Sequence, residues 1–407
     1  MSAEGVKGKP RVDAIRVAIL IGGIHREAGQ TNTILDTLDY LHRACPTWKL
    51  GVFAHEIDHL DTLPKYVDFV PVRAYYSNFL GNARLTRMLR EYDVAYVKGL
   101  YQFVFPAVAA RIPVALVVHQ IDDWRTIGQG LAKIKFLLTR LIIPVVLRFP
   151  SAIVTVTEGL ADFYLRNYGV HATVIGDTVS DDFFRRSREL SSPLNRPLRL
   201  LTVGPWDGWH GRKQQHQLFR LLAEGLARGL DLNLALVGLR PSQVRALQSV
   251  AALIKVETRV SFEGVIEKSL LVERYLTHDV YVTHTTFEGF YRPVIEAFAT
   301  GMPALVYDAN KVVSDPSAAA ATNHIINSGG GELFTDADSF VEGLRSITAN
   351  YDQYSARGFA YAQRFRRDAL GAKTRDLLED LVRKFRDGEG QVRRYDSNTA
   401  PDITRTP

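Results

Sequence analysis

Cysteine and long apolar runs are scarce in this chain. Its 407 residues include one cysteine, Cys45, which excludes an internal disulfide framework and favours a reducing compartment. No stretch approaches the roughly 20 consecutive apolar residues that a transmembrane helix needs. The first residues also lack the apolar run of a signal peptide. We therefore expect a cytoplasmic protein.

A strong excess of either charge is also missing. The formal net charge is +6 and the pI is near 9.2. This mildly basic balance suits an anionic ligand or an anionic membrane face, but it is too diffuse to indicate nucleic acid. At 407 residues with 46% hydrophobic side chains, the chain is long enough for two domains with separate cores.

Short apolar runs separated by helical patterns dominate the chain from Ala14 onward. The run Ala14–Ile21 ends in Gly22-Gly23 and is followed by a helical pattern from Thr31 to Arg43. This order is typical of the first unit of a doubly wound parallel sheet, although a plain tight turn needs only one of the two glycines. We expect further strands at Trp48–Ala54, Asp93–Val97, Val114–His119, Ala152–Val156, Ala172–Ile175, Leu198–Val203, Leu232–Val237, Val260–Phe262, Val280–Thr283 and Ala304–Tyr307.

These runs fall into two α/β sets separated by a polar segment. Arg186–Pro197 holds two prolines and is typical of an interdomain linker. We expect a disordered lead at 1–13, a first Rossmann-like domain at 14–190 and a second at 191–350. Helices at 351–386 and a flexible tail at 387–407 follow.

The stretch Thr283–Asp308 carries the strongest functional signal. It predicts a buried strand, a loop, and a short helix that opens at Pro293, because proline suits the first turn of a helix. Gly301 and Pro303 then end the helix.

The start of that helix lacks a capping residue. Arg292 precedes Pro293, and no Ser, Thr, Asp or Asn stands there to bind the amides of Val294 and Ile295. Free amides at a helix N-terminus beside a guanidinium predict a site for an anion such as phosphate.

Two carboxylates, Glu288 in the loop and Glu296 in the helix, bracket this helix start. They could face one ligand from different heights. Equally, Glu296 could offset the helix dipole while Glu288 is a solvated loop acid. The residues alone favour neither interpretation.

The whole stretch resembles the donor-binding motif of retaining glycosyltransferases of family 4, which have the GT-B fold. The resemblance implies two Rossmann-like domains that face each other across a cleft, with the helices at 351–386 packing back on the first domain. Tyr291 departs from that motif where glycine is usual, and Arg292 departs where an aliphatic residue is usual. The tyrosine puts the shape of the sugar pocket in doubt, because glycine lets backbone amides approach a sugar. The matching residues are Thr285, Glu288, Gly289, Phe290, Pro293, Glu296, Ala297, Ala299, Gly301 and Pro303.

An adjacent arginine and lysine follow the first strand of the second domain. Leu200–Gly204 leads to Arg212-Lys213, which by themselves could be a solvated basic turn. The resemblance implies that Lys213 binds the leaving diphosphate. Pro205 replaces the family's usual arginine after the strand glycine, so we expect Arg212 or Arg292 to take that role.

The resemblance implies further contacts to a nucleotide-sugar donor. It places Gly22 and Gly23 beside the diphosphate, the nucleotide base near Val265, and His119 near the sugar, although His119 could equally be a satisfied strand-end residue. Glu288 would bind sugar hydroxyls. Gly204, Gly289, Phe290 and Tyr291 would line the donor site, Val294, Ile295 and Arg292 would face the diphosphate, and Glu296 would bind the ribose.

The implied reaction is metal-independent, retaining transfer of a sugar from a UDP- or GDP-sugar to an acceptor hydroxyl, with no cofactor. The acceptor stays open among glycan, lipid, protein and small molecule. A nucleotide-sugar epimerase, a glycan phosphorylase and a non-catalytic nucleotide-sugar-binding subunit are the alternatives.

Three other motifs are weaker. His55-Glu56-x-x-His59 matches a zinc-protease string but fits a loop better than a helix. Asp336-Ala337-Asp338 fits a helix N-cap better than a metal-binding acid pair. Lys133–Arg148 mixes apolar and basic residues. It could dock on anionic lipid as a peripheral contact, or form an ordinary buried helix.

Overall fold

The computed structural model describes residues 14–24, 29–57, 63–72, 79–99, 101–119, 142–184, 197–209, 211–313 and 315–388. The predicted lead at 1–13, most of the linker and the tail beyond residue 388 lie outside these ranges. Within them, no helix is both long and apolar enough to cross a membrane.

The first domain is built on a seven-stranded sheet of order β3-β2-β1-β4-β5-β6-β7. Every pairing in it is parallel, as buried apolar strands linked by helices predict. The strands are β1 (Arg16–Ile24), β2 (Lys49–Ile57), β3 (Asp68–Pro71), β4 (Val94–Lys98), β5 (Val114–Val118), β6 (Ala152–Thr155) and β7 (Ala172–Val174), and the helices are α1 (Gly29–Ala44), α2 (Phe79–Leu89), α3 (Val104–Ala109) and α5 (Glu158–Tyr168).

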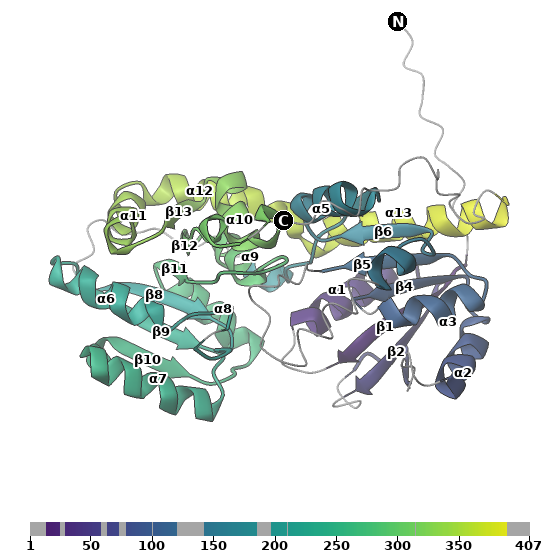
Figure 1. Cartoon of the computed structure of the whole chain (residues 1–407), viewed down its shortest axis with the longest axis horizontal. Helices are drawn as coiled ribbons and strands as arrows, with labels where there is room; N and C mark the ends of the chain where they lie inside the picture. The colour runs from purple at the N-terminus through teal and green to yellow at the C-terminus, as the bar shows by residue number, and fades with distance from the viewer. Residues whose placement is uncertain are drawn as a thin grey trace, which may run out of the picture.

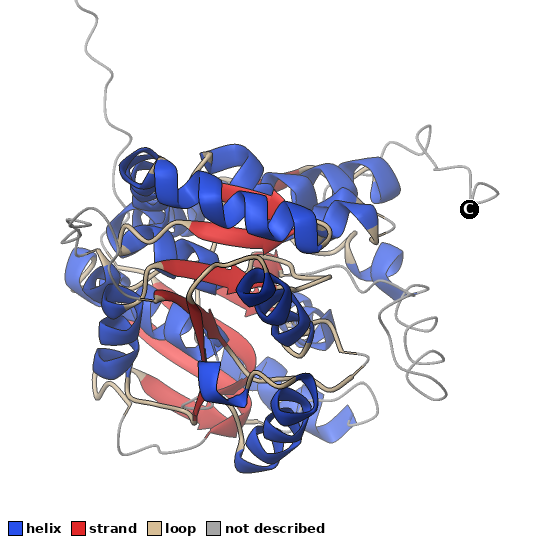
Figure 2. Cartoon of the chain, turned by 90° about the vertical axis from the view of Figure 1, so that its left-hand side faces the viewer, coloured by secondary structure: helices blue, strands red, loops and turns tan. Residues whose placement is uncertain are grey.

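The second domain repeats this plan with a six-stranded parallel sheet of order β10-β9-β8-β11-β12-β13. Helices lie on both sides of the strands (Figure 2). The strands are β8 (Leu198–Val203), β9 (Leu232–Val237), β10 (Val260–Glu263), β11 (Val280–Thr283), β12 (Ala304–Tyr307) and β13 (Gly331–Phe334), and the helices are α6 (Gln217–Ala227), α7 (Pro241–Ile254), α8 (Lys268–Thr277), α9 (Arg292–Ala299), α10 (Ala320–Ser328), α11 (Ala337–Ala349) and α12 (Tyr351–Ala362).

The expected turn at Gly22-Gly23 is wrong. Strand β1 runs through both glycines to Ile24, and Gly23 pairs with Glu56 of β2. The physical reason is Ile24, which is 1% exposed. Burying this side chain in the core extends the strand past the two glycines, which a parallel ladder can accommodate.

The last helix, α13 (Arg367–Arg386), returns to the first domain. It runs along that domain in Figure 1, and Gly371 lies so close to the Tyr40 ring of α1 that a Cβ would sit 2.2 Å from it. Just before α13, the Val179 amide donates to the Phe365 carbonyl at 2.9 Å. Two doubly wound domains with C-terminal helices that cross back are therefore confirmed.

Candidate active site

A short pairing at the carboxyl edge of the second sheet brings the predicted cations to the predicted loop. Lys213 pairs with Thr285 in antiparallel fashion. The Thr286 amide donates to the Arg212 carbonyl at 2.9 Å. Arg212 and Lys213, called the cation pair below, therefore lie beside the loop that follows β11.

The loop that carries the cation pair is held by its own backbone amides. The Asp207 carboxylate accepts from the amides of Arg212 and Lys213, each at 2.9 Å. Gly204, at the end of β8, has φ 125°, and a Cβ there would lie 2.8 Å from the Lys213 ammonium. Only glycine leaves room for this lysine position.

Glu288 faces the cation pair from a loop that is fixed on its other side. Its amide donates to the Ala318 carbonyl at 2.8 Å, and its carbonyl accepts from Ala320 at 3.1 Å. The carboxylate lies 3.8 Å from the Arg212 guanidinium and is 12% exposed. Burial raises the pKa of Glu288, while Lys213 and Arg212 lower it in part.

One oxygen of this carboxylate has no partner. Among the described residues, Glu288 Oε1 is buried without a hydrogen bond. A buried, unsatisfied carboxylate oxygen costs free energy unless a ligand supplies a donor. Sugar hydroxyls are such donors.

The Tyr291 side chain is buried in the second domain. Its backbone adopts φ 57° and ψ 66°, the left-handed region that explains why glycine is usual here. Its ring points inward with 5% exposure, and its hydroxyl lies 2.6 Å from the Thr283 hydroxyl and 3.0 Å from that of Tyr281. The Lys213 ammonium lies 5.8 Å from the ring centre, so the tyrosine packs beneath the lysine.

The start of α9 is less open to an anion than the sequence predicts. The helix begins at Arg292, and its N-cap Tyr291 makes no side-chain cap, as expected. However, the Val294 amide donates to the Tyr291 carbonyl at 3.4 Å. Ile295 is now the fourth helical residue, whose amide belongs to the internal ladder of the helix. The prediction that both amides are free is therefore wrong, because the helix starts one residue earlier.

Arg292 faces the first domain instead of an open anion site. Its Nε donates to the Thr178 carbonyl at 3.0 Å, and its Nη2 donates to the Thr33 hydroxyl of α1 at 3.0 Å. The Asp36 carboxylate lies 3.8 Å from the same nitrogen. This leaves Arg212 as the arginine that faces Glu288.

Glu296 lies in a different environment from Glu288. It accepts from the Tyr275 hydroxyl at 3.0 Å and lies 3.7 Å from Arg292 Nε. Burial raises the pKa of Glu296, opposed by Arg292 and the Tyr275 hydrogen bond. Each acid therefore has its own partners: Arg212 for Glu288, and Arg292 and Tyr275 for Glu296.

His119, directly after β5, contacts residues that sequence reasoning missed. Its Nδ1 lies 3.6 Å from Asp177 Oδ2, and the other Asp177 oxygen lies 3.2 Å from the Lys98 ammonium. Lys98 ends the buried strand β4. A lysine inside an apolar run was the only sequence signal for this group.

The remaining predicted residues come from both domains. Val265 follows β10 and is 51% exposed. The Phe290 carbonyl is bound by the buried imidazole of His324, and Gly289 is buried beside it. Gly22 and Gly23 are half-buried near the carboxyl end of β1.

The weaker motifs have structural explanations. His55 and Glu56 belong to strand β2 rather than to the expected loop, and His59 lies outside the described residues. Asp336 caps α11 through the Ser339 amide at 2.9 Å, which confirms the predicted helix N-cap. In the part of the chain that the structure describes, no three His, Cys, Asp or Glu side chains converge as metal ligands.

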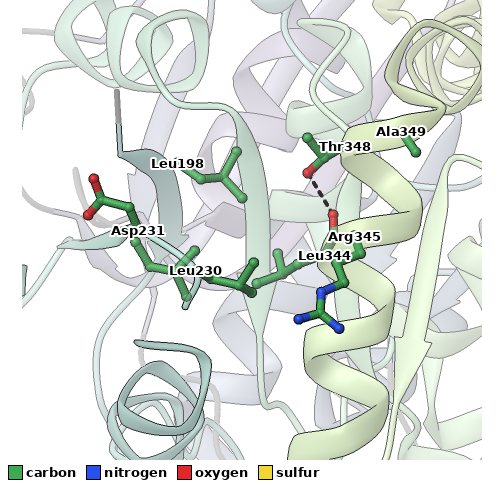
Figure 3. A pocket seen from close by; sticks show the side chains of 8 residues that line it. Leu198, Leu230, Asp231, Leu344, Arg345, Thr348 and Ala349 are labelled. Carbon is green, nitrogen blue, oxygen red and sulfur yellow. Dashed lines mark hydrogen bonds between the residues drawn. The ribbon is translucent and has the colours of Figure 1, made fainter. Parts of the chain in front are cut away.

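One cavity lies away from these residues. It has a volume of about 400 Å³, and Figure 3 shows its lining around Leu198, Leu230 and Leu344. It sits where β8 and β9 begin, whereas ligands of doubly wound domains bind outside the carboxyl ends of strands. Its Thr348 hydroxyl is already bound to the Leu344 carbonyl at 2.7 Å.

Comparisons with known proteins bear on the second domain and on the fold. Residues 197–350 match the family described as Glycosyl transferases group 1. No curated protein matches the sequence.

Solved structures of similar fold cover nearly the whole chain. A glycosyltransferase from Rickettsia africae ESF-5 has a TM-score of 0.70 at 12% identity, covering 91% of this chain and 99% of that one. HepE from Anabaena, in complex with UDP and glucose, has a TM-score of 0.68 at 17% identity, covering 90% and 100%. Sucrose-phosphate synthase from Thermosynechococcus elongatus has a TM-score of 0.66 at 16% identity, covering 91% and 99%.

The fold and the match of the second domain define the class of protein. The chain is a glycosyltransferase with two facing parallel-sheet domains, the GT-B fold.

Proposed function

We propose that the protein transfers a sugar from a nucleotide diphosphate sugar to an acceptor hydroxyl, with retention of anomeric configuration and without a divalent metal. The observation that carries the proposal is the buried Glu288 carboxylate, with one unpartnered oxygen, 3.8 Å from Arg212. The Glu288 carboxylate can accept hydrogen bonds from sugar hydroxyls while the cation pair beside it binds the diphosphate. HepE binds UDP and glucose, which supports a UDP-sugar among the candidate donors.

The cation pair would stabilise the leaving diphosphate. Breaking the anomeric bond places negative charge on the departing oxygens, and preorganised donors there lower the barrier. The two Asp207 hydrogen bonds hold the cation pair in place before the donor arrives. We propose that Glu296 binds the ribose and that the departing phosphate accepts the proton of the attacking hydroxyl on the same face.

A panel of UDP- and GDP-sugars, each added with EDTA or with Mg²⁺, tests donor and metal together. A donor at about 100 times its Kd adds roughly 2.7 kcal/mol to the folded state and so raises Tm. NMR of the first product formed should show the donor's own anomeric configuration. Inversion, or turnover only with Mg²⁺, would refute the corresponding part of the proposal.

The same measurements of Tm, turnover and product distinguish the alternative functions. An epimerase isomerises the donor, a phosphorylase requires inorganic phosphate, and a binding subunit raises Tm without turnover. Arg212→Ala should lower kcat/KM about 10²- to 10³-fold, as loss of one oxyanion donor does. Arg228→Ala, at the end of α6, is the matched control.

We also propose a cytoplasmic enzyme that contacts a membrane surface peripherally. Ile142 and Val145, three residues apart on the helix at 142–146, are 37% and 48% exposed. Phe149, 41% exposed, follows this helix beside the exposed Arg148. Residues 133–141 of the predicted basic segment lie outside the described residues. Val145→Asp should weaken co-sedimentation with anionic vesicles but not with neutral ones, where little binding is expected.

A further inference from the structure

Lys98 is a buried cation placed at the edge where the two domains meet. Only 3% of its side chain is exposed, and its ammonium lies 3.2 Å from Asp177 Oδ1. Burial lowers the pKa of Lys98, and the carboxylate raises it in part. A lysine in such a place needs an ionised partner to stay charged.

Asp177 is that partner, and it has a second one. Its other oxygen faces His119 Nδ1 at 3.6 Å. Burial acts to raise the pKa of Asp177, but Lys98 and then His119 hold it well below its ordinary value. The histidine therefore faces a permanent carboxylate.

A carboxylate opposite Nδ1 selects one state of the imidazole. The ring proton stays on Nδ1, and Nε2 carries a lone pair. Nε2 is buried and has no hydrogen-bond partner among the described residues. An acceptor in this position needs a donor from a ligand.

We propose that Lys98 and Asp177 form a positioning pair that fixes the ring orientation and tautomer of His119, so that Nε2 accepts a hydrogen bond from a hydroxyl of the bound sugar. The positioning role of the pair is independent of the proposed function, and only the identity of the ligand as a sugar rests on it. A buried ion pair with a purely structural role would stabilise the sheet edge and leave the imidazole unaffected.

The other charged groups that act on the pair come from both domains. Arg292 of α9 lowers the pKa values of both Lys98 and Asp177, and Asp36 of α1 raises that of Lys98. Arg292 and Asp36 are unchanged in the variants below, so a change in the His119 NMR signal reports on Lys98 and Asp177 themselves.

Nitrogen-15 NMR of the histidine rings tests the proposal on the full chain without substrate. His119→Gln identifies the signal. In the wild type we expect the Nδ1–H tautomer at neutral pH. Lys98→Met removes the neighbouring positive charge, so His119 should titrate at a higher pH.

The double variant Lys98→Met/Asp177→Leu removes both charges of the buried pair and guards against a folding defect of the single variant. In it, the Nδ1–H tautomer should lose its preference. Donor turnover should fall about 10- to 100-fold, by analogy with lost partners of metal-bound imidazoles, and Lys98→Arg should restore part of it.

Two results have separate meanings. An identical His119 signal in the wild type and the double variant overturns the positioning role. A shifted signal in a protein that binds none of the UDP- and GDP-sugars of the panel supports the pair and refutes the proposed function.

Discussion

At Tyr291 the backbone and the side chain favour different residues. A left-handed conformation costs a non-glycine residue about 1–2 kcal/mol, so Tyr291→Gly relieves strain. The same change removes an aromatic ring that is 5% exposed, and loss of such a ring typically costs about 3–5 kcal/mol. The hydroxyls of Thr283 and Tyr281 also lose their shared partner.

The lost packing outweighs the relieved strain. We expect Tyr291→Gly to destabilise the second domain by about 3 kcal/mol, which lowers Tm by roughly 6–12 °C for a domain of this size. Tyr291→Phe keeps the ring beneath Lys213 and loses only the hydrogen bonds, at about 1–2 kcal/mol. It should keep donor affinity, whereas the glycine variant should weaken it.

Differential scanning calorimetry measures both changes. Lys255 is the matched control, because it also has a left-handed backbone, at φ 61°, but an exposed side chain. Lys255→Gly should be neutral or stabilising by about 0.5–1 kcal/mol. A Tyr291→Gly protein that melts at or above the wild-type temperature would refute the reasoning.

Three further predictions concern the same site. Burial raises the pKa of Glu288 above its ordinary 4.5, so ionisation opposes folding as pH rises through the folded-state pKa. Glu288→Gln should therefore raise Tm at neutral pH but not below pH 4.5, and it should abolish turnover. An equal rise in Tm at both pH values would contradict this reasoning. Arg292→Met should lower the free energy of unfolding by about 3–5 kcal/mol in calorimetry, because it leaves buried carboxylates unpaired. The control Arg364→Met, at an exposed arginine, should not. Equal effects of the two changes would argue against the interdomain contact of Arg292. Gly204→Ala should weaken donor binding about tenfold or more in titration calorimetry, since 1.4 kcal/mol is a factor of ten and the added Cβ displaces the lysine of the cation pair. Gly208→Ala, at φ 94° with open space around it, should not.

Local patterns were sufficient for most of the fold. Strands β8, β9, β11 and β12 were predicted to the residue, because their apolar runs stop at turn residues. Strand β3 was missed, since Asp68–Pro71 is a short, half-exposed edge strand without an apolar run. The end of β1 was misplaced because burial of Ile24 overrides the local preference of two glycines.

The candidate site was predictable only where its residues share a motif. The resemblance placed Glu288 and the cation pair in one region, and the pairing of Lys213 with Thr285 confirms that they are neighbours. Arg292 was misjudged because its partners Thr178 and Thr33 lie 114 and 259 residues away. The contact between Lys98 and Asp177 was likewise invisible, since it depends on two strands ending at the same edge.

The bridge between Val179 and Arg366 bears on how the molecule can open. The return crossing into α13 pairs there with Val179, near the end of the first domain, so backbone hydrogen bonds join the two halves beside this crossing. We therefore expect the two domains to open by a hinge rotation about this paired segment. A protease that cuts between residues 184 and 197 should leave both pieces associated, because α13 still anchors the second piece to the first.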